Sequence, residues 1–371
     1  MKKHLLVTIS LLAISIMLIS WGSTGHFKIN TEASLSYNAQ MSQFNAWTST
    51  LAEHASDADK RKSSDPTESP KHYIDIDGYP EFIATGQIPQ TLDSVILIHG
   101  EPFVYDKGIL PWATMITFDS LKNCFARLDW EKAVLFAADL GHYVADGHMP
   151  LHITENYNGQ LTGNSGIHSR YESTMINGYI GQISYAGMDI SIIPDVNEYI
   201  FNYLYLNYTY VDSVLAADNY AKSVSGGSTT SSAYKTALWN KSKGFTIPLF
   251  KNASHALTEL MYTAWVLAGS PIMPNTSIFS PEARKSYSLG QNIPNPFEHS
   301  TTINYVLFKK SDLLLQVKDM CGKTVATIVN EHKPIGSYSL EWSPENITAG
   351  IYYLVMKTSE SVEVKKIVLL N

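Results

Sequence analysis

Residues 138–172 have the sequence ADLGHYVADGHMPLHITENYNGQLTGNSGIHSRYE. His142 and Asp146 are four residues apart in a segment whose apolar spacing predicts a helix, so both side chains leave the same helix face. His168 and Glu172 repeat this spacing after a loop rich in Gly and Asn, and His152 lies between the two pairs. Helical domains build metal sites for more than one ion from facing turns of this kind.

The donor types narrow the kind of site. Imidazole and carboxylate donors without a nearby cysteine favour a catalytic zinc site over a structural site rich in cysteine. A single His and carboxylate four residues apart is more often a surface pair. The prediction therefore depends on further ligands elsewhere in the chain.

Composition and charge set the broad class. The chain has 371 residues, 44% of them hydrophobic and 16% charged, which is typical of a globular protein long enough for two domains. A net charge of -7 argues against a surface that coats nucleic acid. Cys124 and Cys321 are about 200 residues apart and fall in different predicted domains, so we predict no stabilising disulfide.

The amino terminus has the pattern of a secretory signal peptide. Lys2 and Lys3 precede the apolar run LLVTISLLAISIML, and Ser20 is an acceptable residue at the cleavage point. Cleavage there would leave Trp21 as the first residue, whose free amino group and carbonyl can chelate a metal ion, with His26 five residues further on. A retained membrane anchor is the alternative.

A second group of candidate ligands precedes the central stretch. Apolar residues at three- and four-residue steps predict one or two helices between about 29 and 55. Asp57 and Asp59 follow this region, and a loop rich in Pro and Ser separates them from His72. Either aspartate can therefore approach His72 in space.

The remaining pattern divides the chain into two domains of different class. Helices are predicted over 112–128, from an Asp129 N-cap through His142, over about 193–223, and from an Asn252 N-cap to Gly269. After a linker rich in turn residues the hydrophobic period becomes two, which predicts six or seven short strands and a small β-sandwich. We predict a signal peptide over 1–20, an all-α domain over 21–278, a linker over 279–288 and an all-β sandwich over 289–371.

The candidate ligands together resemble those of the zinc-dependent phospholipase C and single-strand-specific zinc nuclease superfamily. These enzymes share an all-α fold and a site for three zinc ions that begins with a tryptophan at the mature amino terminus. The resemblance spans about 21–172 and extends more weakly to about 275. Nine residues match in order: Trp21, His26, Asp57, His72, His142, Asp146, His152, His168 and Glu172.

The resemblance implies a role for each residue. One zinc ion would be held by Asp57, His72, His142 and Asp146, with Asp59 a near rival of Asp57. A second would take Trp21 and His26 and share Asp146, and the third would take His152, His168 and Glu172. A hydroxide bridging two ions, oriented or deprotonated by Asp57, would cleave a phosphodiester to a phosphomonoester, without an organic cofactor.

The substrate class is less sharply indicated. GIHSRYE and its glutamate resemble the phospholipases, whereas WGSTGH and HYID resemble the nucleases, in which the positions of Tyr73 and Asp75 contact a nucleobase. The disulfides common in the nucleases are missing, and the acidic balance disfavours duplex DNA. We favour a phospholipase C-like hydrolase of phosphodiester bonds acting on a phospholipid headgroup, with a zinc endonuclease or 3'-nucleotidase as the alternative.

The predicted sandwich resembles the type IX secretion sorting domain of Bacteroidetes-type bacteria. This resemblance covers about 286–371 and implies export by the signal peptide, then passage through the outer-membrane secretion machinery to the cell surface or medium. The matching residues are Leu289, Gln291, Asn292, Pro294, Asn295, Pro296, Phe297, Asp319, Gly322, Lys323, Gly350, Tyr352, Lys365 and Lys366.

A non-catalytic alternative is a surface binding protein that zinc ions only stabilise. Open coordination positions for a substrate argue against it. The histidines without matching partners need no function, and His148 is the nearest of them to the predicted ligands: His54, His99, His148, His255, His299 and His332.

Overall fold

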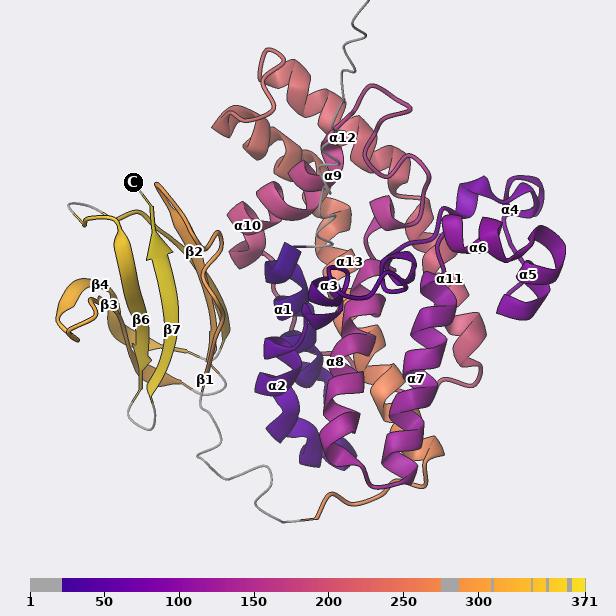
Figure 1. Cartoon of the computed structure of the whole chain (residues 1–371), viewed down its shortest axis with the longest axis horizontal. Coiled ribbons are helices and arrows are strands. Elements are labelled where there is room, and N and C mark those ends of the chain that lie inside the picture. Colours follow the sequence, from indigo (N-terminus) through magenta and orange to yellow (C-terminus); the bar gives the residue numbers. More distant parts are fainter. Residues whose placement is uncertain are drawn as a thin grey trace, which may run out of the picture.

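The structure is a computed structural model that describes residues 22–274, 287–307, 310–334, 336–344, 347–358 and 362–370. It has a helical domain followed by two antiparallel sheets, which confirms the predicted fold class (Figure 1). The predicted signal peptide and Trp21 lie outside the described residues. Within the described residues, no helix combines the length and apolarity needed to cross a membrane.

The helical domain is built around three long helices, α7, α8 and α13 (Figure 1). Its α-helices are α1 (Gly22–Glu32), α2 (Thr48–Glu53), α3 (Asp57–Arg61), α4 (Pro80–Thr85), α5 (Leu92–His99), α6 (Glu101–Asp106), α7 (Leu110–Ala126), α8 (Trp130–Asp146), α9 (Ile167–Ser169), α10 (Ile176–Tyr179), α11 (Val196–Tyr208), α12 (Val211–Val224) and α13 (Ser232–Leu267). Short 3-10 turns include Ala33–Ser36, Ala39–Trp47, Ser69–His72 and Pro150–His152.

Helix α8 follows the sequence signals that predict it. The Asp129 side chain accepts a hydrogen bond from the Lys132 backbone N–H and caps the first turn. Ala133, Ala137 and Leu140 are buried along the face that packs in the core. This helix therefore presents its polar residues, His142 and Asp146, at a fixed place in the domain interior.

The prediction that a helix starts at Asn252 is wrong. Asn252 lies inside α13, which begins after a Ser231 N-cap and continues through Pro248 to Leu267. The predicted stop is close to the observed one, since the chain turns at Gly269 with φ +90°. Between 29 and 55 the chain forms α1 and α2 with 3-10 turns between them, and the predicted 193–223 segment is divided into α11 and α12.

A buried asparagine fixes α1 against α8. The Asn30 side-chain amide donates to the Leu51 and Ala138 carbonyl oxygens, at 3.1 Å each. Gly141 passes so close that an added Cβ atom would lie 2.2 Å from Asn30 Oδ1 and 2.7 Å from Leu257 Cδ2. Glycine at position 141 is therefore required for the close packing of these helices.

Gly141→Ala should destabilise the protein by about 1–3 kcal/mol, because overpacking in this core outweighs the better helix propensity of alanine. Gly244 is the matched control, since it is also helical and an added Cβ there has nothing within 4 Å. Gly244→Ala should be neutral or stabilising by up to about 1 kcal/mol. Urea unfolding of both variants checks the prediction, and equal effects would contradict it.

The C-terminal domain is a sandwich of two antiparallel sheets. One sheet has the order β1 (Tyr287–Leu289), β2 (Thr301–Leu307), β5 (Gly336–Trp342), and the other has the order β4 (Thr324–Lys333), β3 (Ser311–Lys318), β6 (Gly350–Lys357), β7 (Val362–Leu369). Buried residues such as Leu315, Leu354 and Ile367 form its core. The first strand begins two residues before the predicted domain start at 289, and most of the predicted linker lies outside the described residues.

The motif residues near 292 have a structural role. The Asn292 side chain donates to the Pro294 carbonyl, and the Asn295 side chain both donates to the Lys366 carbonyl and accepts from the Val368 N–H. Phe297 is buried in the sandwich core. Asn295 therefore ties this segment to the backbone of β7 through its side chain.

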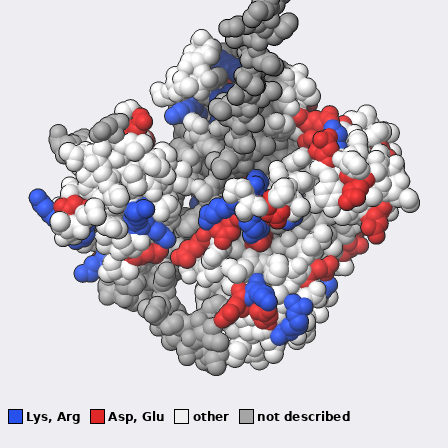
Figure 2. All heavy atoms as spheres, in the orientation of Figure 1, with Lys and Arg blue, Asp and Glu red and all other residues white. Residues whose placement is uncertain are grey.

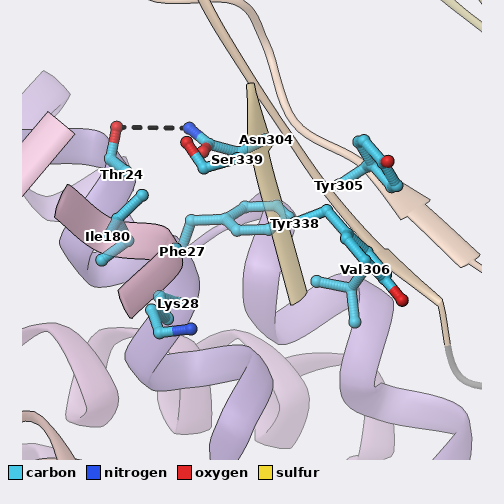
Figure 3. Close-up of a pocket in the computed structure, with 10 residues that line it drawn as sticks. Thr24, Phe27, Lys28, Ile180, Asn304, Tyr305, Val306, Tyr338 and Ser339 are labelled. Carbon is cyan, nitrogen blue, oxygen red and sulfur yellow. Dashed lines mark hydrogen bonds between the residues drawn. The ribbon is translucent and has the colours of Figure 1, made fainter. Parts of the chain in front are cut away.

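The two domains meet at α1, at the 3-10 turn Ile180–Gln182 and at α2. Phe27 and Thr24 of α1, with Ile180, face Asn304, Tyr338 and Ser339 of β2 and β5 across a small pocket (Figure 3). Asn304 Nδ2 donates to Thr24 Oγ1 at 3.4 Å. The sandwich thus contacts the first helix of the helical domain.

Candidate metal centre

The first cluster consists of Asp59, His72, His142 and Asp146. His72 Nδ1 lies 2.9 Å from His142 Nε2 and 3.0 Å from Asp146 Oδ2, and His142 Nε2 lies 3.3 Å from the same oxygen. Asp59 Oδ1 lies 3.6 Å from His72 Nδ1 and 3.7 Å from His142 Nε2. A tetrahedral zinc ion with ligands at 2.0–2.1 Å requires separations of about 3.3–3.5 Å between its ligands.

The orientation of His142 is set by the backbone. Its Nδ1 lies 2.8 Å from the Ala55 carbonyl oxygen, which can only accept, so Nδ1 carries the proton. Nε2 is therefore the nitrogen that offers a lone pair to the cluster.

The structure does not bring Asp57 into this cluster. Its carboxylate is one-third exposed and contacts His54 Nδ1 at 2.5 Å and Lys60 Nζ at 2.7 Å. Asp59, two residues later on α3, faces His72 and His142 instead. Because α3 turns this face inward, Asp59 replaces Asp57 as the candidate ligand and as the candidate catalytic carboxylate.

The second cluster uses the other oxygen of Asp146. His26 Nε2 lies 3.5 Å from Asp146 Oδ1, and the His26 ring stacks on His142 with 3.9 Å between the ring centroids. Trp21, the predicted partner of His26, lies outside the described residues, immediately before α1. Asp146 is thus placed between two clusters, as the resemblance implies.

The third cluster consists of His152, His168 and Glu172. Glu172 Oε2 lies 3.1 Å from His168 Nε2 and 3.5 Å from His152 Nε2. The Nδ1 atoms of the two histidines face the carbonyl oxygens of Tyr157 and His72, so both Nε2 atoms face the carboxylate. His168 lies in α9 and Glu172 in the π-helical turn Arg170–Met175.

The donor sets fit metal ions. The atoms Asp59 Oδ2, Asp146 Oδ1, His152 Nε2 and His168 Nε2 are buried and make no hydrogen bond with the described residues. Buried polar atoms normally have a partner, so these point to a cation that completes the site. The described residues therefore hold three groups that could each bind a metal ion.

The ionisable groups of the clusters also shift one another's pKa values. Burial, and next the neighbouring His142, lower the pKa of His26 to about 3. Burial also lowers the pKa of His142, but Asp146 and Asp59 outweigh it and raise that pKa to about 9. For Asp146, burial raises the pKa, and the histidines around it lower the pKa well below its ordinary value. The buried carboxylates thus require positive charge beside them.

Tyr73 and Asp75 lie next to the third cluster. Ile74 lies between them, and its backbone N–H donates a hydrogen bond to the carbonyl of His152, a member of this cluster, at 2.8 Å. The Tyr73 hydroxyl donates to the Asp106 carbonyl at 3.2 Å, and burial raises the pKa of Asp75 to about 7. Their position fits a substrate-binding role, which remains a prediction.

Sequence reasoning missed two residues near the clusters. Tyr157 is partly exposed, and its ring lies 6.0 Å from that of His168. Glu68 is buried, and its Oε1 lies 3.5 Å from His72 Nε2. The spacing of four residues between Glu68 and His72 was a possible signal, whereas nothing in the local sequence distinguishes Tyr157.

Comparison with known proteins identifies the C-terminal domain. Residues 292–370 match the family model of the secretion system C-terminal sorting domain. This part of the chain is a type IX secretion sorting domain, which supports secretion of the chain or its export to the cell surface.

The comparison with solved structures covers both domains. An alpha toxin from Clostridium absonum is 11% identical with a TM-score of 0.38, and the match covers 95% of this chain and 96% of the toxin. An alpha-toxin from an avian strain of Clostridium perfringens is 11% identical with a TM-score of 0.39, and the match covers 94% of each chain. Both likenesses are too remote to carry a function to this chain. Among curated proteins, none matches it.

Proposed function

We propose that the helical domain is a secreted zinc-dependent hydrolase of phosphodiester bonds, of phospholipase C type. The observation that carries the proposal is the first cluster, whose donor separations of 2.9–3.7 Å lie on both sides of the roughly 3.3–3.5 Å that one tetrahedral zinc ion requires. Asp146 would bridge this ion to a second, and His152, His168 and Glu172 would hold a third. Bound zinc ions supply Lewis acidity and lower the pKa of water toward neutrality.

The chain's own residues provide the remaining functions. Asp59 is 14% exposed, whereas His142 and Asp146 are fully buried, so a substrate reaches the first cluster from the side of Asp59. Asp59 Oδ2 makes no hydrogen bond with the described residues, and in this proposal it would orient an attacking water and accept its proton. Lys62 Nζ, 2.7 Å from Asp59 Oδ1, adds a cation there that offsets charge on a phosphate group.

The surroundings of Tyr73 favour a cationic headgroup. Tyr73 has Asp75, Asp106 and Tyr157 as its charged or titratable neighbours. Aromatic faces with adjacent carboxylates bind quaternary ammonium groups. The lobe formed by residues 80–106 is acidic, and Figure 2 shows acidic side chains over it, with Lys107 directly after it and 3.9 Å from the Asp106 carboxylate. The excess of acidic side chains disfavours a polyanion such as DNA. These features support phosphatidylcholine as the substrate class.

The test compares two substrates with the full mature chain loaded with zinc. We expect release of phosphocholine from phosphatidylcholine in mixed micelles, abolished by chelator and reduced about 100-fold or more by His152→Ala. His255→Ala is the control, since His255 faces Glu259 in α13 and none of the three clusters. Faster cleavage of single-stranded DNA would make the protein a nuclease. Inactivity on both substrates with retained zinc would favour a binding protein that zinc ions stabilise.

A further inference from the structure

Glu68 is a buried carboxylate in contact with a candidate ligand. Its side chain is 1% exposed, and Oε1 lies 3.5 Å from His72 Nε2, the ring nitrogen that points away from the first cluster. Since His72 Nδ1 faces the first cluster, the proton of the neutral ring lies on Nε2. Glu68 Oε1 thus faces that proton across a 3.5 Å contact, in which the structure forms no hydrogen bond.

Three donors hold Glu68 in its ionised form. The Tyr143 hydroxyl donates to Oε1, Lys71 Nζ donates to Oε2 at 2.9 Å, and Arg61 donates to both oxygens at 3.4 Å. Arg61 also contacts the Asp139 carboxylate at 3.0 Å. A buried carboxylate with this set of partners keeps its charge and its position.

The same contacts join the three segments that supply the first cluster. Arg61 ends α3, which carries Asp59, and Tyr143 and Asp139 belong to α8, which carries His142 and Asp146. Glu68 itself directly precedes the turn Ser69–His72. One carboxylate therefore links α3, this turn and α8.

We propose that Glu68 is a positioning residue that fixes the tautomer and orientation of His72 and holds the ligands of the first cluster at the separations a zinc ion requires. This proposal depends on the proposed zinc site. Partners of metal-binding histidines in other proteins act in this way, and their loss typically lowers metal affinity 10–100-fold.

The test measures zinc affinity by competition with a chromophoric chelator, in the full mature chain. Glu68→Met should lower the affinity of one zinc equivalent 10–100-fold and leave the other equivalents within about threefold. Glu68→Gln retains an acceptor oxygen and should show a smaller loss, of about 3–10-fold. When cobalt replaces zinc, the Glu68 variants should show altered absorption bands for the ion of the first cluster alone. A purely structural role of Glu68 would not change these bands.

Glu259→Met is the matched control. Glu259 is also a buried glutamate, held by Ser191, Tyr199 and His255, and it contacts none of the three clusters. This variant should lose stability without a change in zinc affinity. Tyr143→Phe is a milder second variant, because it removes only one hydrogen-bond donor to Glu68. It should therefore fold even if Glu68→Met does not. It should lower the zinc affinity of the first cluster about threefold or more.

Two results would overturn the proposal in different ways. Unchanged zinc affinity and cobalt bands in Glu68→Gln and Tyr143→Phe would make Glu68 purely structural, while the metal centre itself would stand. If the unmodified chain binds no zinc, the proposed function fails together with this inference.

Discussion

Asp59→Asn should lower the rate of phosphodiester hydrolysis by about 100-fold or more and remove about one zinc equivalent, whereas Asp57→Asn should keep activity within about threefold. Asp59 Oδ1 lies within 3.7 Å of both histidines of the first cluster, so its charge is part of the donor set. Among the described residues, the Asp57 carboxylate pairs with His54 and Lys60 at the surface, and exposed pairs of this kind contribute about 0–1 kcal/mol.

The comparison of these two variants is well matched. Both change a carboxylate to an amide on the same short helix, so general effects on α3 are shared. Activity measured with zinc content distinguishes loss of the metal from loss of proton transfer. The opposite ranking, with Asp57→Asn inactive and Asp59→Asn active, would restore the ligand that the sequence resemblance favoured.

Removal of zinc by chelator should abolish activity and lower the thermal midpoint of the helical domain by more than about 10 °C. A ligand that binds only the folded state adds about 4 kcal/mol at a thousandfold excess over Kd, and each kcal/mol shifts Tm by about 2–4 °C in a domain of this size. Without the ions, the buried carboxylates of Asp146 and Glu172 lose a countercharge.

The sandwich provides an internal control for this experiment. None of the groups able to hold a metal ion lies in its described strands, so its own unfolding transition should not move. If the zinc-free chain is still folded at the assay temperature and adding zinc restores activity, zinc has a catalytic role. Unfolding at that temperature would favour a structural role, and an unchanged helical transition after zinc loss would contradict the metal centre.

Local sequence was sufficient to predict much of the candidate site. The four-residue spacings of His142 with Asp146 and of His168 with Glu172 depend only on helix geometry, and the structure places each pair together. His152 follows the same helix after a short turn, so its position is also locally determined. The change from helical to alternating periodicity similarly indicated where the sandwich begins.

The choice between Asp57 and Asp59 could not be made from sequence. They lie on different faces of a five-residue helix, and the inward face is set by contacts of Arg61 with Glu68 and Asp139. Asp139 is far from α3 in the sequence, so its contribution is visible only after folding. Glu68 was overlooked for the same reason, since its other partner Tyr143 also lies on α8.

Other parts of the fold were missed because short helices carry weak signals. Helices α4, α5 and α6 have six to eight residues each, and segments of this length are not stable on their own. They are formed by packing of residues such as Val95 and Val104 into the core. In α13, Asn252 resembles an N-cap in the local sequence, although the helix runs through it and through Pro248.

Asp146 connects two of the clusters through a single carboxylate, with Oδ2 beside His142 and Oδ1 beside His26. The effect of a substitution at Asp146 cannot be confined to one cluster. A displacement of α8 likewise moves both carboxylate oxygens together. Variation that tunes one of these sites alone must therefore come from residues on other segments. Along a lineage of such proteins, the two sites would be inherited together or lost together.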